Sequence, residues 1–109
     1  MKTEYQNVVI DRIRKLRLER NISQQQLALL LGISNGQIGN IESYKTIHKY
    51  TLNHIYKICC EFGVPIEEIF YGKREGEATS NLRLIEHIVR YENNMITENR
   101  KATANAIAE

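Results

Sequence analysis

SQQQLALLLGISNGQIGNIE, which runs from residue 23 to residue 42, is the stretch that decides the fold of this chain. It contains two pairs with the spacing of a capping box, in which each side chain binds the other residue's backbone N–H: Ser23 with Gln26, and Ser34 with Gln37. Gly32 stands where the first helix must end, because a residue without Cβ adopts the left-handed conformation of a helix C-terminus at low cost. The stretch therefore predicts two short helices joined by a tight turn, with Ile33 filling the corner.

The second of these helices has an unusual polar face. At about 100° per residue, Gln37, Ile38 and Ile41 fall on one side and small or amide side chains fall on the other. The small and amide residues are Asn35, Gly36, Gly39, Asn40 and Ser43. Two glycines in a helix cost about 1 kcal/mol each relative to alanine, so we expect close approach of another molecule to compensate. Asparagine pairs with N6 and N7 of adenine in the major groove, and this face therefore favours DNA as the partner.

These residues resemble the helix-turn-helix proteins of the phage-repressor and Cro-like kind, often called the XRE family. The resemblance covers Val9 to Tyr71. It is carried by Ile13, Leu16, Ser23, Gln24, Leu27, Ala28, Gly32, Ile38, Ile41, Glu42, Leu52, Ile55, Ile58, Phe62, Gly63, Val64, Ile69 and Phe70. It implies an all-α fold, in which a compact five-helix domain lays the second helix of the motif in the major groove and the first across the DNA backbone.

The resemblance also implies which residues contact DNA. Gln24 would hold a phosphate at the start of the first motif helix. The major groove would meet Asn35, Gly36, Gln37, Gly39 and Asn40, and the far backbone would meet Ser43 to Lys49, among them Ser43, Tyr44, Lys45 and Lys49. The chain departs from the family in a longer loop after Glu42, in Pro65 at a position where a hydroxyl cap is usual, and in Leu29 and Leu30 at positions that are usually charged.

Charge is distributed unevenly along the 109 residues, whose formal net charge is +2. Residues 1–74 carry eleven Lys and Arg against seven Asp and Glu, whereas residues 75–109 carry four against six. Five basic residues crowd the first predicted helix, Val8 to Arg20: Arg12, Arg14, Lys15, Arg17 and Arg20. Such a cluster attracts phosphate, and we expect contacts from Arg17 and Arg20 in particular. The alternative is an ordinary solvated face.

The remaining pattern predicts three more helices and no strands. Thr51 caps a helix that ends at Gly63 and places on one face Leu52, Ile55, Tyr56, Cys59 and Phe62. A short helix follows from Ile66 to Tyr71. The glycines and charges of residues 72–76 then mark a break. We therefore expect a helix-turn-helix DNA-binding domain at residues 1–74 and a helical extension at residues 75–109.

The extension carries two apolar stripes at helical spacing. One is formed by Leu82, Ile85, Val89 and Ile96, and the other by Leu84, Ile88, Tyr91 and Met95. The helix can fold back onto its own domain, over Leu29, or pair with its copy in a homodimer, and the two arrangements are compatible. Two stripes favour a dimer, with contacts from Leu82, Ile85, Ile88, Val89 and Met95.

No pattern in the chain points to catalysis, a cofactor or a metal. The three histidines have no metal-ligand spacing, and the adjacent Cys59 and Cys60 suit neither an ordinary disulfide nor a zinc site. Glu42 is interpreted as a structural residue at a helix end, and His54 as a surface or capping residue. No stretch is long and apolar enough to span a membrane, and no signal-peptide core follows Met1, so we expect a cytoplasmic protein.

The sequence thus favours a dimeric, sequence-specific transcriptional regulator that binds double-stranded DNA at a palindromic operator and represses. Two narrower roles stay open: an antitoxin with a toxin as partner, and the controller of a mobile element or restriction system. An adaptor that kept the fold and lost DNA binding is the alternative from another class, since fold does not determine function.

Overall fold

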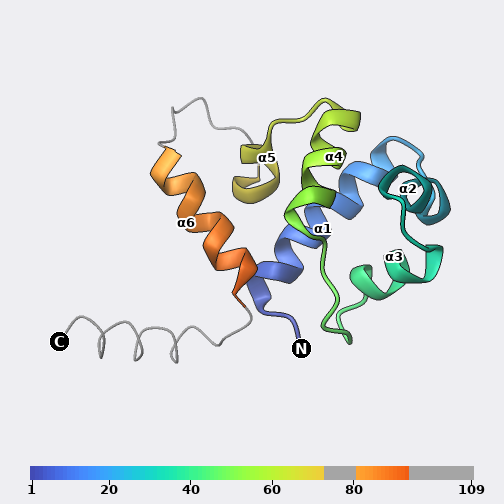
Figure 1. The fold of residues 1–109 in the computed structure, drawn as a ribbon, viewed down its shortest axis with the longest axis horizontal. Coiled ribbons are helices and arrows are strands. Elements are labelled where there is room, and N and C mark those ends of the chain that lie inside the picture. Colours follow the sequence, from blue (N-terminus) through green and yellow to red (C-terminus); the bar gives the residue numbers. More distant parts are fainter. Residues whose placement is uncertain (73–80, 94–109) are drawn as a thin grey trace.

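The computed structural model describes residues 1–72 and 81–93, which form helices and connecting turns with no strand among them. The helices are α1 (Glu4–Glu19), α2 (Gln24–Leu31), α3 (Asn35–Glu42), α4 (Leu52–Phe62), α5 (Ile66–Tyr71) and α6 (Asn81–Glu92). Helix α1 contacts α3 near one end of the molecule and α5 and α6 near the other (Figure 1). The predicted all-α class is confirmed.

Side-chain caps determine where α1, α2, α3 and α4 begin. The two predicted capping boxes, at Ser23 and Ser34, are both present. Two more occur, at Thr3 with Gln6 and at Thr51 with His54. The cap at Thr3 starts α1 at Glu4, earlier than the Val8 start that the apolar pattern predicted, and the cap at Thr51 confirms the capping role of His54. Left-handed glycines end α2 and α4, as predicted: φ is 71° at Gly32 and 64° at Gly63.

The core is a single apolar cluster to which every helix contributes. Its fully buried members include Val9, Ile13, Leu27, Ile38, Ile55, Ile58, Ile69 and Phe70. Helix α4 buries Ile55 and Phe62 as predicted, but Ile58 is buried in place of Leu52 and Tyr56, which are exposed. Helix α3 packs into the core through Ile38 and Ile41, so its opposite side faces solvent.

Helix α6 folds back onto α1 and α5. The stripe of Leu84, Ile88 and Tyr91 faces the core, and Tyr91 is fully buried. Ile88 therefore packs within its own domain, which corrects its expected place in a dimer contact. The expected packing over Leu29 is also wrong, because Leu29 lies on α2 and stays 76% exposed.

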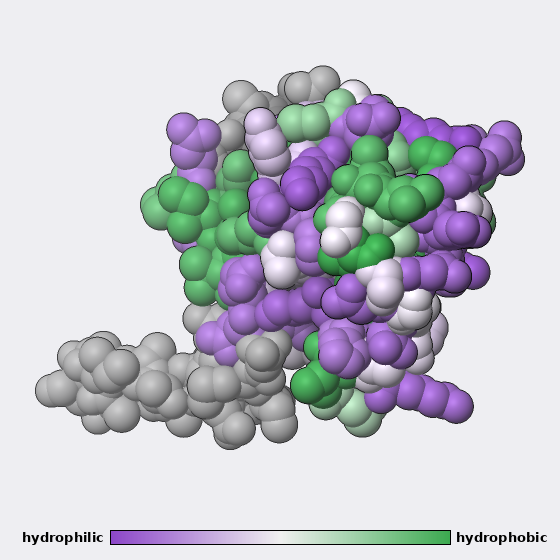
Figure 2. Space-filling view, turned by 45° about the vertical axis from the view of Figure 1, so that its right-hand side comes forward, coloured by the Kyte–Doolittle hydropathy of each residue, from purple (hydrophilic) through white to green (hydrophobic). Residues whose placement is uncertain are grey.

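The second stripe of α6 points to solvent. The exposed fractions are 67% for Leu82, 54% for Ile85 and 45% for Val89. Hydrophobic side chains gather along the left edge of the molecule, over α6, in the space-filling view (Figure 2). Met95 and Ile96, which continue the two stripes in the sequence, lie outside the described residues.

None of the helices in the described ranges has the length and apolar character needed to cross a membrane.

Candidate nucleic-acid interface

Helix α3 presents a polar, small-residue face to solvent. Asn35, Gly36, Gln37 and Asn40 are exposed and Gly39 is half-buried, while Ile38 and Ile41 lie in the core. The side chain of Gln37 accepts from the backbone N–H of Ser34 at 2.9 Å, so its carbonyl oxygen is used in the helix cap. The facing of α3 is thus the one expected from its period, except that Gln37, expected beside Ile38 and Ile41, is exposed. The amides of Asn35 and Asn40 are accessible.

Nothing in the described residues requires glycine at the two glycine positions of α3, Gly36 and Gly39. Neither has a positive φ. A Cβ on Gly36 would come no closer than 4.0 Å to Ser34 Oγ, and one on Gly39 would lie 3.8 Å from Gln24 Oε1, an ordinary van der Waals contact. An alanine would fit at both positions and would stabilise the helix by about 1 kcal/mol each. The described part of the chain therefore gives no internal reason for a surface without side chains here.

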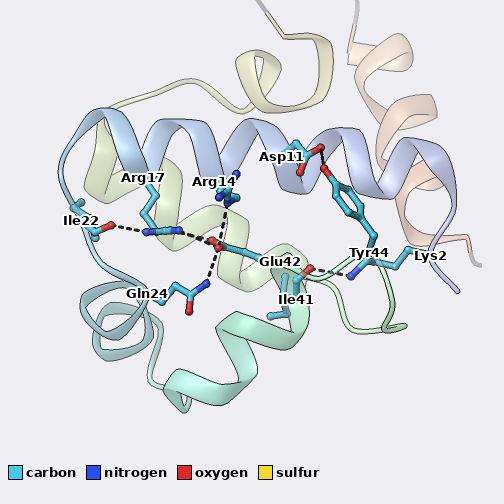
Figure 3. A network of polar contacts seen from close by, with 9 residues as sticks. All are labelled: Lys2, Asp11, Arg14, Arg17, Ile22, Gln24, Ile41, Glu42 and Tyr44. Atoms are coloured by element: carbon cyan, nitrogen blue, oxygen red, sulfur yellow. Dashed lines mark hydrogen bonds and ion pairs between the residues drawn. The ribbon is translucent and has the colours of Figure 1, made fainter.

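A buried carboxylate fixes the C-terminal end of α3 (Figure 3). The side chain of Glu42 is 5% exposed and accepts two hydrogen bonds from Arg17, from Nε to Oε2 and from Nη2 to Oε1, each at 2.9 Å. Gln24 Nε2 donates to Oε1 at 2.9 Å, and Arg14 Nε lies 3.7 Å from the same oxygen. One side chain thereby joins α1, α2 and α3, which confirms the structural role expected for Glu42.

Two arginines, Arg17 in α1 and Arg20 at its C-cap, bind groups within the protein. Arg17 is 5% exposed, and its Nη1 donates to the carbonyl of Ile22 at 2.7 Å. The expected phosphate contact of Arg17 is therefore wrong, because its guanidinium is enclosed by Glu42 and Ile22. Arg20 is exposed, but its Nη2 donates to the carbonyl of Phe62 at 3.1 Å and its guanidinium carbon lies 4.8 Å from the centroid of that ring.

The α3–α4 loop, residues 43–51, is held by a lysine from the chain's N-terminus. Lys2 Nζ donates to the carbonyls of Ile41, Ser43 and His48 at 2.7 to 2.8 Å. The side chain is buried, and this burial lowers the pKa of Lys2. Sequence reasoning missed this contact, since nothing in the pattern of the first few residues links them to a loop some forty positions away.

Some side chains of the α3–α4 loop are exposed, and others contact the rest of the protein. Tyr44 and Lys45 are exposed, and the Tyr44 hydroxyl donates to Asp11 Oδ2 at 2.7 Å. Ser43 is half-buried. Lys49 turns toward α6, where its Nζ donates to the carbonyl of Glu92 at 3.0 Å, so the structure gives this residue a role other than the expected phosphate contact. Gln24, Ser43, Tyr44 and Lys45 remain predicted contacts.

The two adjacent cysteines of α4 differ in exposure. Cys59 is half-buried, and burial raises the pKa of its thiol to about 11, which disfavours the reactive thiolate. Cys60 is exposed. Within residues 1–72 and 81–93, no three His, Cys, Asp or Glu side chains cluster as a metal site would require.

Comparison with known proteins agrees with this geometry. A helix-turn-helix family model matches residues 13–69, more than half of the chain. The chain belongs to this family of XRE and phage-repressor-like helix-turn-helix proteins, and it is a DNA-binding regulator of that kind. No curated protein and no solved structure matches it.

Proposed function

We propose that this chain is a sequence-specific transcriptional repressor that reads an operator with the exposed face of α3. The observation that carries the proposal is the pair of helical glycines between Asn35 and Asn40, for which the fold offers no internal reason. A surface without side chains lets a helix backbone approach the floor of the major groove. The neighbouring amides then reach base edges, where asparagine matches adenine.

The support of α3 fits that role. Base readout needs side chains held in fixed positions by the surrounding structure. The Ser34 capping box fixes the start of α3, and Glu42 fixes its end through a bidentate arginine. Gln24 links the start of α2 to the same carboxylate. The two helices of the motif therefore approach DNA as one rigid unit.

Replacing Asn40 by alanine tests base readout. Asn40→Ala is expected to cost about 1–3 kcal/mol against the preferred duplex and to leave binding to random duplex nearly intact, because an amide on a base edge discriminates sequence whereas phosphate contacts do not. Affinities measured across single-base variants of the site decide the point. Asn81→Ala, which removes an exposed amide on α6, serves as control. Unchanged preference of Asn40→Ala at every base pair would remove Asn40 from the readout.

We further propose that the repressor is a homodimer joined through the exposed stripe of α6. Helix-turn-helix proteins of this class read two half-sites related by a two-fold axis, which requires two copies of α3. Leu82, Ile85 and Val89 have the three- and four-residue spacing of a coiled-coil seam. One side of α6 is already used by its own domain, and a second copy of the same helix offers a complementary apolar surface for the other.

A charge placed in this stripe is expected to separate the protomers. Ile85→Asp should sediment as a monomer under conditions where the unaltered protein is a dimer, because an unpaired carboxylate in an apolar contact costs several kcal/mol. Sedimentation equilibrium at micromolar concentrations measures this. Leu29→Asp places the same charge on an exposed apolar residue of α2, which is 76% exposed against 54% for Ile85, and should leave the dimer intact. Unaltered protein that stays monomeric at high micromolar concentration contradicts the proposed dimer.

A further inference from the structure

We propose that α6 positions the α3–α4 loop for DNA, with Tyr91 and Lys49 as the positioning residues. The inference rests on the proposed function, because it concerns how the loop beside α3 is held for phosphate contact. It assigns α6 a role within each protomer that is separate from the proposed dimer contact: the buried stripe of the helix acts on the loop, while the exposed stripe faces outward.

Tyr91 joins α6 directly to the loop backbone. Its hydroxyl donates to the carbonyl of Tyr50 at 2.7 Å, and both residues are fully buried. The ring of Tyr91 packs edge-on against Phe70, with 5.8 Å between centroids, which fixes the direction of the hydroxyl. Burial raises the pKa of Tyr91, so the hydroxyl keeps its proton and remains a donor. The end of the loop thus depends on a residue 41 positions later in the chain.

Lys49 makes a second connection, from the loop to α6. Its Nζ lies 3.0 Å from the carbonyl oxygen of Glu92 and 3.5 Å from that of Tyr91, and 5.5 Å from the centroid of the Tyr91 ring. The last carbonyls of a helix lack partners within the helix and carry a partial negative charge, which a lysine satisfies. Gln6 Nε2 donates to the Tyr91 carbonyl at 2.7 Å from the other side.

The rest of the loop is held by Lys2, whose ammonium binds the carbonyls of Ser43 and His48. Between these two attachments lie Tyr44 and Lys45, which are exposed. The backbone of the loop is thus held from the N-terminal segment and from α6, and both supports lie outside residues 13–69, the part that matches the family. Undocking α6 would therefore release the loop at Lys49 and Tyr50, next to the His48 attachment of Lys2, and by linkage DNA bound to the loop would stabilise the docked helix.

The test uses the full-length chain and a duplex with a single half-site, so that dimer formation does not contribute. Tyr91→Phe keeps the ring and removes the bond to Tyr50, and we expect about three- to tenfold weaker half-site binding. Tyr71→Phe is the matched control, because it removes a buried hydroxyl that has no hydrogen-bond partner within the described residues. A purely structural Tyr91 would lower the melting temperature of Tyr91→Phe while the folded protein bound the half-site as before, and that result overturns the inference.

Variants of Lys49 separate positioning from direct phosphate contact. Lys49→Met is expected to weaken half-site binding without changing its dependence on salt, whereas Lys45→Gln should reduce the salt slope by about one unit. Lys49→Arg, which can still donate to the helix carbonyls, should restore affinity. A reduced salt slope for Lys49→Met would assign Lys49 to a phosphate and overturn its positioning role. Unaltered protein that prefers no sequence overturns the proposed function itself, whereas a half-site affinity that is equal in Tyr91→Phe overturns only this inference.

Discussion

Replacing Glu42 by alanine is expected to lower the free energy of unfolding by about 3–5 kcal/mol, because it leaves the charge of Arg17 buried without its partner. The two side chains are 5% and 6% exposed and meet in a bidentate arrangement, so water cannot replace the lost carboxylate. The same substitution removes the acceptor of Gln24. Chemical denaturation followed by circular dichroism measures the loss.

The matched control for Glu42 is the double variant Arg17→Met with Glu42→Leu. It removes both charges together and fills their place with apolar side chains, and such exchanges are often neutral or stabilising. We expect the double variant to recover most of the stability that Glu42→Ala loses. A loss below about 1 kcal/mol for Glu42→Ala, the range typical of exposed ion pairs, would contradict the buried, interhelical role given to this carboxylate.

Replacing Tyr91 by alanine is expected to cost about 3–5 kcal/mol, because a large aromatic ring leaves a cavity that the surrounding helices fill only in part. The ring is fully buried against Phe70, and its hydroxyl satisfies the Tyr50 carbonyl. Tyr91→Ala therefore also leaves a buried acceptor without its donor. Equilibrium denaturation of the full-length chain gives the value.

Two further substitutions serve as comparisons for the stability loss of Tyr91→Ala. Tyr91→Phe keeps the ring and should lose about 1 kcal/mol, the usual net value of one hydrogen bond. Val89→Ala removes a half-exposed side chain from the other stripe of α6 and should cost less than Tyr91→Ala by several-fold. Equal losses for Val89→Ala and Tyr91→Ala would mean that α6 does not dock by its Tyr91 face.

The features that sequence reasoning predicted correctly depend on residues close together in the chain. The caps at Ser23 and Ser34 use partners three positions away. The left-handed conformation of Gly32 depends on that residue's own lack of a Cβ. The facing of α3 follows from a single helical period. Each of these can be found without knowing the rest of the fold, which is why the helix-turn-helix motif was predictable.

The features that it missed depend on distant partners. Arg17 belongs to a basic cluster that is typical of a phosphate-binding surface, but Glu42, 25 positions later, encloses it. Lys49 was assigned to DNA because nothing local indicates the helix end at Glu92, 43 positions away. The two stripes of α6 were evident from their spacing. The spacing did not reveal which of the two stripes packs against the domain, because it does not identify the surface that covers each stripe.

Selection of bound sequences from random duplex DNA, performed with the full-length chain, tests the central claim most directly. We expect enrichment of one motif with two-fold symmetry, whose half-sites lie about 10 base pairs apart or a multiple of that distance, so that two copies of α3 meet the same side of the duplex. When the selection is repeated with Asn40→Ala, the selected sequences should show no base preference at the positions that Asn40 reads. A library that returns no enriched sequence would contradict the account and would favour an adaptor that retains the helix-turn-helix fold without reading DNA.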